Sequence, residues 1–197
     1  MKGKIADINE LILPPIEKSG VLLYGPNEYR VNKNYIKIYN ELNKDNDEIL
    51  GAQELDANII LNQAETFFNE INTINLGGGI KVVKIDLTDT DKAGCLENYL
   101  ENPTDNSFIV VKSGKLGPKS KLRGLFEKSE NFIVIPFYED TLKDTNIFIE
   151  NYMNSNKLSI THDAKQKIIS FTGQNNKVLE SILELILLYH QCFYFLN

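Results

Sequence analysis

Short apolar runs alternate with helical patterns along the first two-thirds of the chain. Five segments have the composition of buried or half-buried strands: residues 21–24, 48–55, 80–85, 107–111 and 132–135. Between them, apolar residues recur at helical spacing in residues 28–42, 59–68, 91–100 and 120–126. Parallel strands need crossover connections, so this alternation predicts an α/β domain with a parallel sheet of about five strands and helices on both faces.

The pattern becomes purely helical after Asp140. Apolar residues recur at helical spacing in residues 145–154, 161–171 and 176–189. Thr161 has the side chain of a helix N-cap, and Gly173 stands where a C-cap is expected. We therefore expect two domains, an α/β domain over residues 1–140 and a small all-helical domain over residues 141–197.

The net charge and the cysteines indicate which partners and which cellular compartment to expect. The formal net charge of −6 argues against general attraction to nucleic acid, although a local basic face stays open. Cys95 and Cys192 fit no metal-ligand spacing, which favours a reduced, cytoplasmic protein. Residues 1–9 carry charges and no stretch reaches 18 uncharged apolar residues, so we expect no secretory signal and no membrane span.

The turn after the first strand stands where a nucleotide-binding P-loop would lie. Gly25 and Pro26 end the strand and a helix follows, but the motif G-x-x-x-x-G-K-[ST] is incomplete. Its second Gly, its Lys and its Ser/Thr are replaced by Arg30, Val31 and Asn32. The residues also show no catalytic or metal-ligand constellation. We therefore expect no ATP, cofactor or metal here, and the local sequence alone favours a plain strand-ending turn.

Several separated segments resemble one family in their order and spacing. They are VLLYGPNE at 21–28, ELDA at 54–57, NTI at 72–74 with GG at 78–79 and KVV at 81–83, SKLRGLFEK at 120–128 and IPFYED at 135–140. The chain to about Tyr189 resembles the bacterial DNA polymerase III delta subunit. The resemblance implies a degenerate, ATPase-like AAA+ domain, a helical lid domain and a third, collar domain. We find no collar counterpart, as expected of a truncated, split or frameshifted gene product.

The resemblance also implies a function. The delta subunit is a non-catalytic part of the clamp loader that binds and opens the sliding clamp during DNA replication. The family name carries the DNA-directed DNA polymerase activity of the holoenzyme, not an activity of this subunit. The implied partners are the sliding clamp, the other clamp-loader subunits, with contacts weakened by the missing collar, and primed DNA.

A hydrophobic wedge carries clamp binding in the resembled family, just before a glycine turn. The matching positions here are Asn75, Leu76 and Gly77, with Ile74 as a neighbouring apolar residue. Leu76 fits the first wedge residue, whereas Gly77 replaces a second one that is usually aromatic. An ordinary core leucine is the alternative interpretation of Leu76.

Three further alternatives concern the basic residues, catalytic activity and the role in replication. Lys119, Lys121 and Arg123 contact DNA phosphates or form a solvated basic face. An active P-loop NTPase is disfavoured by the missing Gly-Lys-Ser/Thr. A folded remnant with no role in replication is favoured by Gly77 and the missing collar.

Overall fold

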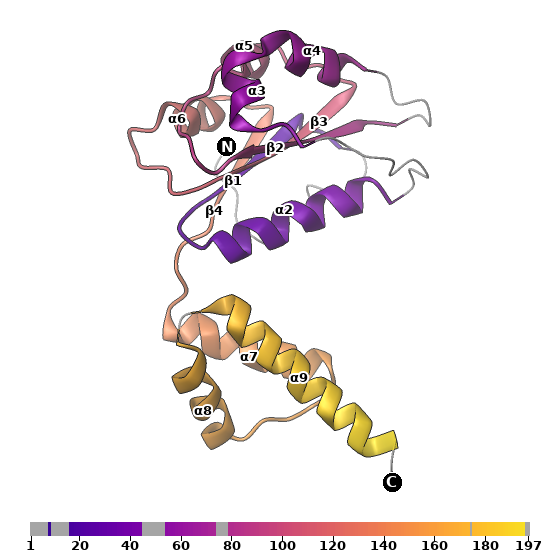
Figure 1. Ribbon diagram of the computed structural model, residues 1–197, viewed down its shortest axis with the longest axis vertical. Coiled ribbons are helices and arrows are strands. Elements are labelled where there is room, and N and C mark those ends of the chain that lie inside the picture. The colour runs from indigo at the N-terminus through magenta and orange to yellow at the C-terminus, as the bar shows by residue number, and fades with distance from the viewer. Residues whose placement is uncertain (1–7, 9–15, 45–53, 74–78, 174, 196–197) are drawn as a thin grey trace. The chain divides into compact units, whose positions relative to one another are not determined.

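The computed structural model describes residues 8, 16–44, 54–73, 79–173 and 175–195. The chain divides into two compact units, Met1–Tyr138 and Glu139–Asn197. The first unit is a layered α/β structure and the second consists of helices (Figure 1).

The described part of the first unit contains a four-stranded, fully parallel sheet. Its strands are β1 (Gly20–Tyr24), β2 (Lys81–Leu87), β3 (Ser107–Ser113) and β4 (Phe132–Pro136). They lie in the order β2-β3-β1-β4, so β1 is central and pairs with both β3 and β4. This confirms the predicted α/β fold class, and all five residues of β1 are buried, as its unbroken apolar run indicated.

The strand expected at residues 48–55 needs correction. Residues 45–53 lie outside the described part of the chain. Leu55 makes an isolated parallel bridge to Ile85, donating its amide to the Lys84 carbonyl. Asp56 then caps a helix at once, with its carboxylate accepting from the Ile59 amide at 2.9 Å. Because the helix begins directly after Leu55, the strand pairing ends there, and the described sheet has four strands instead of about five.

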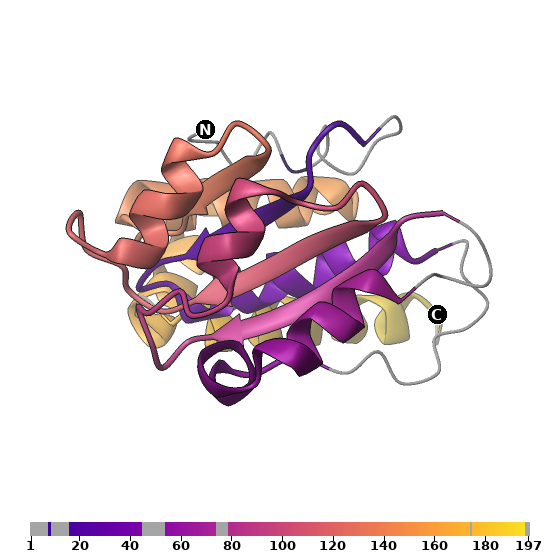
Figure 2. The same cartoon turned by 90° about the horizontal axis from the view of Figure 1, so that it is seen from above.

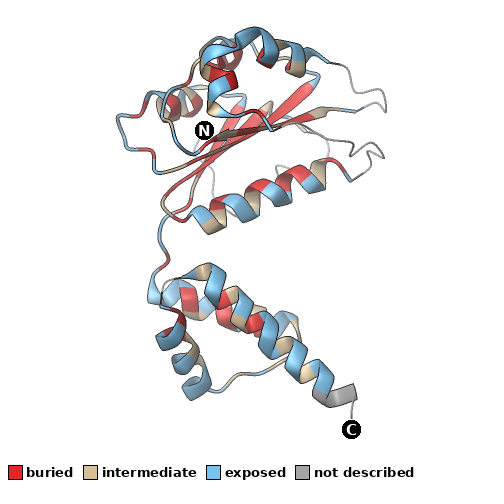
Figure 3. Ribbon diagram, viewed as in Figure 1, coloured by how far each residue is buried: buried red, intermediate tan, exposed pale blue. Residues whose placement is uncertain are grey.

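Helices cover both faces of the sheet (Figures 1 and 2). One face packs against α2 (Glu28–Leu42), whose buried residues are Val31, Tyr35, Ile38 and Tyr39. The opposite face packs against α3 (Ala57–Asn62), α4 (Ala64–Asn72), α5 (Leu96–Glu101) and α6 (Lys121–Lys128). Buried positions concentrate in the strands and in the helix sides that face them (Figure 3).

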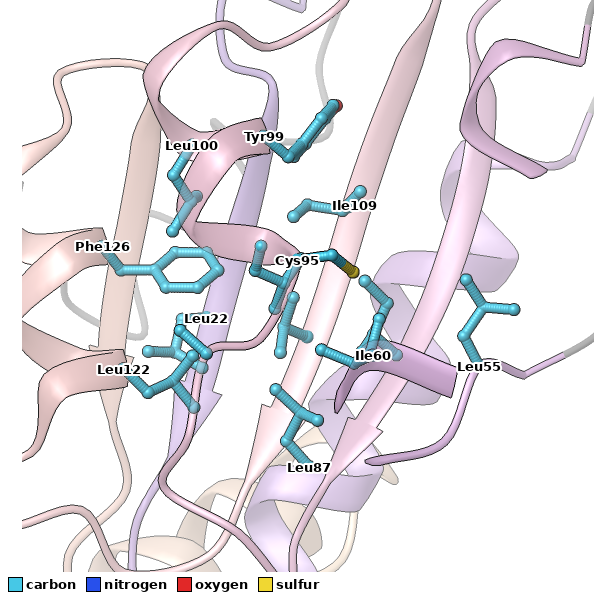
Figure 4. Close-up of a cluster of buried hydrophobic side chains, with 14 of the residues drawn as sticks. Leu22, Leu55, Ile60, Leu87, Cys95, Tyr99, Leu100, Ile109, Leu122 and Phe126 are labelled. Atoms are coloured by element: carbon cyan, nitrogen blue, oxygen red, sulfur yellow. The ribbon is translucent and has the colours of Figure 1, made fainter. Parts of the chain in front are cut away.

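A series of aromatic rings holds the face that α4, α5 and α6 cover. Neighbouring rings meet edge to face in the order Phe67, Tyr99, Phe132 and Phe126, with centroid separations of 5.6, 6.1 and 5.4 Å. Such pairs contribute about 0.5–1.5 kcal/mol each beyond the area that they bury. Tyr99 and Phe126 lie among aliphatic side chains such as Leu22 of β1 (Figure 4).

Two predicted helices have different bounds in the structure. The helix expected at 59–68 is divided into α3 and α4 at Gln63, whose φ and ψ of −130° and 56° are not helical. The Ile60 carbonyl accepts a hydrogen bond from the Cys95 amide, so it serves a contact outside its own helix. The helix expected at 91–100 begins only at Leu96, because Gly94 has a φ of +52° that an α-helix does not accommodate.

The second unit contains α7 (Leu142–Ser155), α8 (His162–Thr172) and α9 (Asn176–Phe195). Thr141 and Asp144 form a reciprocal capping box at α7, and Thr161 caps α8 as expected. Gly173 ends α8 with a φ of +57°. The unit buries its own core, made of Ile149, Met153, Ile169, Leu179 and Leu183. No helix in the described ranges is long and apolar enough to span a bilayer.

Candidate functional site

The turn between β1 and α2 is the position of the incomplete P-loop. Only Gly25, Pro26 and Asn27 connect the strand to the helix. Gly25 has a φ of +142°, and Asn27 caps α2 by accepting from the Arg30 amide at 3.2 Å. Arg30 therefore already lies in the first turn of α2, half-buried. A turn this short cannot wrap phosphates with successive backbone amides as a P-loop does.

The backbone after β4 covers this turn. We call Phe137 and Tyr138 the covering segment. The Phe137 amide donates to the Tyr24 carbonyl at 2.7 Å, and the Phe137 carbonyl accepts from the Asn27 amide at 3.2 Å. The Asn27 side-chain amide reaches the Tyr138 carbonyl at 3.4 Å. An amide that would face a phosphate in a P-loop is thus already bonded within the chain.

The covering segment also explains why residue 25 is glycine. A Cβ built on Gly25 would lie 2.1 Å from the Phe137 carbonyl oxygen, which is far inside contact distance. The positive φ of Gly25 excludes other residues for a second, independent reason. Gly25 thus allows two segments of backbone to approach each other closely. In a P-loop, a glycine instead allows the backbone to approach a phosphate.

The three basic residues that the sequence suggested as DNA contacts differ in their surroundings. Arg123 is half-buried, with its guanidinium 5.3 Å from the ring centroid of Tyr24 and its Nε 2.8 Å from Glu127 Oε1. Lys121 forms an ion pair with Glu97 at 2.6 Å, which links α6 to α5, and Lys119 is exposed. Burial raises the pKa of Tyr24 by more than the nearby Arg123 lowers it.

A second polar cluster, which the sequence patterns did not indicate, lies between α2 and the sheet. Lys112 of β3 pairs with Asp86 of β2 at 2.9 Å and lies 3.6 Å from Glu54. Its ammonium also lies 4.8 Å from the ring centroid of Tyr35, and the Tyr35 hydroxyl donates to Glu54 at 2.7 Å. We call these four residues the Lys112 cluster.

The surroundings of Asp86 and Tyr35 in the Lys112 cluster stabilise one protonation state of each. Burial acts to raise the pKa of Asp86, but hydrogen bonds from Thr88 and Lys112 outweigh it and hold the pKa below its usual value. Burial, and then the hydrogen bond to Glu54, raise the pKa of Tyr35 well above its usual range. Asp86 is therefore a carboxylate and Tyr35 a neutral hydroxyl donor across the physiological pH range.

The expected wedge residues Ile74, Asn75, Leu76 and Gly77 lie outside the described part of the chain. Their two flanks are described. The preceding helix α4 buries Phe67 and Ile71 in the core, and the following strand begins at Lys81. Lys81 Nζ forms an ion pair with Glu70 at 2.7 Å and donates to the Glu70 carbonyl at 2.6 Å. An ion pair thus links α4 and β2, the described elements on the two sides of this segment.

The described residues offer no obvious place for a metal ion. They contain no group of three or more His, Cys, Asp or Glu side chains arranged to hold one. The aspartates after β2 border a hollow of about 580 Å³ formed by residues 88–92 and 113–116. This hollow also contains Lys92 and Lys115, so its charges are mixed and fit neither a cation nor an anion selectively.

Comparisons with known proteins decide the family. The family described as "DNA polymerase III, delta subunit" matches residues 21–137, which is more than half of the chain. The chain belongs to this family. No curated protein matches it. Among solved structures, the Bacillus subtilis DNA clamp loader delta protein (YqeN) is similar with a TM-score of 0.64 and 15% identity.

That structural match covers 93% of this chain and 57% of the Bacillus protein. The likeness therefore extends over both units of the delta-family chain, although it spans little more than half of the other protein. At this level of identity the match shows a shared fold. It confirms the resemblance inferred from the separated sequence segments.

The close approach at residue 25 leads to a testable prediction. Gly25→Ala should lower the free energy of unfolding by about 1–3 kcal/mol, because it forces a strained φ and a clash with the Phe137 carbonyl. Gly124→Ala is the matched control, since a Cβ there meets nothing within 4 Å and alanine favours the helix by about 0.5–1 kcal/mol. Urea unfolding followed by circular dichroism measures both. Equal stability of the Gly25→Ala variant and the parent would contradict the close approach.

The Lys112 cluster predicts a dependence of stability on pH. The folded-state pKa of Asp86 lies below its ordinary value of 3.8. The ionised Asp86 carboxylate therefore contributes fully to the free energy of unfolding above pH 3.8, and this contribution is lost as the pH falls through the folded-state pKa. Asp86→Asn should lower the free energy of unfolding near neutral pH by about 1.5 kcal/mol. The difference from the parent should shrink below pH 3.8.

Urea titrations of both proteins over a pH series measure this difference. Asp89→Asn in the exposed loop after β2 is the control and should follow the parent at every pH. A difference between parent and Asp86→Asn that stays constant with pH would show that the carboxylate charge is not what stabilises the cluster.

Proposed function

We propose that this chain is a non-catalytic clamp-loader subunit that binds the sliding clamp and helps to open it during DNA replication. Membership of the delta-subunit family is the basis of the proposal. The observation that carries its non-catalytic part is the bond from the Asn27 amide to the Phe137 carbonyl, which closes the turn where a nucleotide would be held.

The Lys112 cluster supports the same conclusion from another position. P-loop NTPases hold Mg²⁺ partly through an aspartate that follows a strand of the sheet. Here Asp86, at the end of β2, is paired with Lys112 and accepts from both the amide and the hydroxyl of Thr88. An ammonium group thus neutralises this carboxylate without a metal ion. ATP hydrolysis belongs to other subunits of the loader under this proposal.

Clamp binding is assigned to the segment between α4 and β2. Leu76 is the apolar residue proposed to enter a pocket on the clamp, with Ile74 beside it and Asn75 and Gly77 completing the contact. The pairing of Lys81 with Glu70 supports this assignment, because it links the described residues on the two sides of the segment. Such a link reduces the ordering cost of binding.

The remaining partners follow from the same role. We propose that the chain associates with the other clamp-loader subunits and acts in the cytoplasm, where the replicating DNA lies. Its cysteines in the described part of the chain, Cys95 and Cys192, are both free thiols, which accords with a reducing compartment.

Surface plasmon resonance against the sliding clamp of the same organism tests this function. Leu76→Ala should weaken binding by roughly thirtyfold or more, since truncating a central apolar anchor typically costs about 2 kcal/mol. Gly77→Phe should tighten binding by supplying the second large apolar residue, provided that position 77 does not need a positive φ.

Leu142→Ala is the matched control, because Leu142 is a leucine of α7 with 63% of its surface exposed. It should bind the clamp as the parent does. If Leu76→Ala also binds as the parent does, Leu76 is an ordinary core leucine and the assignment of the wedge fails.

A further inference from the structure

The helical unit contains a hollow of about 570 Å³ that has no part in the proposed clamp contact. It lies within the second unit, where the connection between α7 and α8 meets the first two turns of α8 and the C-terminal half of α9. Its volume falls in the range of about 300–1,000 Å³ that is typical of small-molecule sites. We call it the α7–α9 hollow.

The wall of the α7–α9 hollow is mainly apolar. Its aliphatic and thioether side chains are Met153, Leu158, Ile160, Ala164, Ile168 and Ile186. Met153 belongs to the buried core of the unit, and Leu158, Ile160 and Ile168 are half-buried against that core. Contacts with the core thus hold these side chains, while they also present apolar surface to the hollow. An aliphatic group that enters the hollow is favoured because it leaves water.

The polar side chains of the hollow favour an anion over a cation. Lys157 and His190 line it together with two hydroxyl residues, and the described lining residues include no aspartate or glutamate. The Thr161 hydroxyl already accepts from the Ala164 amide as the cap of α8. Lys157 therefore supplies a permanent positive charge beside an apolar wall, in a chain whose net charge is −6.

The backbone of Lys157 indicates that its side chain has a use. Lys157 has a φ of +58° and is the only non-glycine residue with a positive φ in the described ranges. It follows Asn156, the C-cap of α7, and the amides of Lys157 and Leu158 donate to the carbonyls of Asn154 and Met153. Glycine is the usual residue at this point of a helix end, because it has no Cβ. A lysine holds the left-handed conformation at a cost, and such residues are found preferentially at ligand sites.

We propose that the α7–α9 hollow binds a small organic anion that has an aliphatic body and one carboxylate, such as a medium-chain fatty acid. The aliphatic body lies against the apolar wall, and the Lys157 ammonium donates charge-assisted hydrogen bonds to the carboxylate. One permanent positive charge matches a carboxylate better than a phosphate monoester, which carries nearly two negative charges at neutral pH. The site does not depend on clamp binding, so either proposal can fail without the other.

Isothermal titration calorimetry of the full chain with sodium decanoate, kept below its micelle concentration, tests the proposal. Decanoate should bind saturably at one site per chain, with a dissociation constant of about 1 mM or tighter, as expected of a ligand of this size. Two probes separate the body from the charge. Decyltrimethylammonium has the same body and the opposite charge, and acetate has the charge without the body. Each should bind at least about tenfold more weakly than decanoate.

Substitutions of Lys157 separate a ligand contact from a structural role. Lys157→Gly should weaken decanoate binding by about tenfold or more. The same change should raise the midpoint of thermal unfolding by about 2–4 °C, because glycine accepts the positive φ without strain. Lys157→Gln removes the charge but keeps a side chain, and should weaken binding equally. Lys143→Gln is the matched control, since Lys143 is an exposed lysine at the start of α7 and should be dispensable for binding.

A substitution within the wall tests whether decanoate occupies this hollow. Ala164 lines the hollow and is exposed, so Ala164→Trp adds bulk to the hollow without entering the core of the unit. This variant should show no saturable decanoate binding. Gln166→Trp places the same ring on an exposed position of α8 outside the lining and should bind as the parent does. Circular dichroism checks that each variant is folded.

Four outcomes overturn the proposal. Decanoate that binds without saturation, or at several sites per chain, only adsorbs to apolar surface. Equal binding of decanoate and decyltrimethylammonium would show that charge has no role. Unchanged binding by Lys157→Gln would remove the assigned contact, and unchanged binding by Ala164→Trp would place the site elsewhere. Failure of decanoate binding with intact clamp binding would leave the proposed clamp-loader function standing.

Discussion

The contact between Gly25 and the backbone of Phe137 is the constraint on which much of the first unit depends. It joins the end of the central strand β1 to the chain that leaves β4, through bonds at the Tyr24 carbonyl and the Asn27 amide. A side chain at position 25 would not fit, since its Cβ would lie 2.1 Å from a carbonyl oxygen. The turn is therefore completed by the protein itself and needs no phosphate to satisfy its amides.

This closed turn and the Lys112 cluster hold α2 at two points along its length. The first turn is capped by Asn27, and Tyr35 in the middle of the helix bonds to Glu54 and contacts Lys112. Both arrangements stand where a nucleotide-dependent relative would place phosphates and a metal ion. The result is a scaffold with a fixed helix and fixed strand ends, which accords with the proposed role in binding partners.

The sequence predicted the local parts of this structure well. The buried strands of the described sheet, the caps Thr161 and Gly173, and the parallel arrangement all follow from periodicity and composition. The break at Gln63 and the late start of α5 were missed because they depend on contacts such as that between Ile60 and Cys95. Apolar periodicity reports only which face of a segment is buried, so it does not reveal bonds between segments distant in sequence.

The candidate site likewise has features that the sequence revealed and features that depend on contacts between distant segments. The incomplete P-loop was visible in the sequence, because Arg30, Val31 and Asn32 are consecutive replacements. The covering segment was not, since Asn27 and Tyr138 are 111 positions apart. Asp86 and Lys112 became partners only through the register that places these two residues opposite each other in β2 and β3. Their opposite charges near the ends of neighbouring predicted strands were the one signal available beforehand.

The central claim is that the turn after β1 is closed to nucleotides and that the chain acts by binding. Isothermal titration calorimetry with ATP and Mg²⁺ tests it most directly, because it detects binding without requiring hydrolysis. The account predicts no saturable heat of binding. Saturable binding of ATP at one site per chain would contradict it, because the Asn27 amide and Asp86 would then have to release Phe137 and Lys112 to bind the nucleotide and its metal ion.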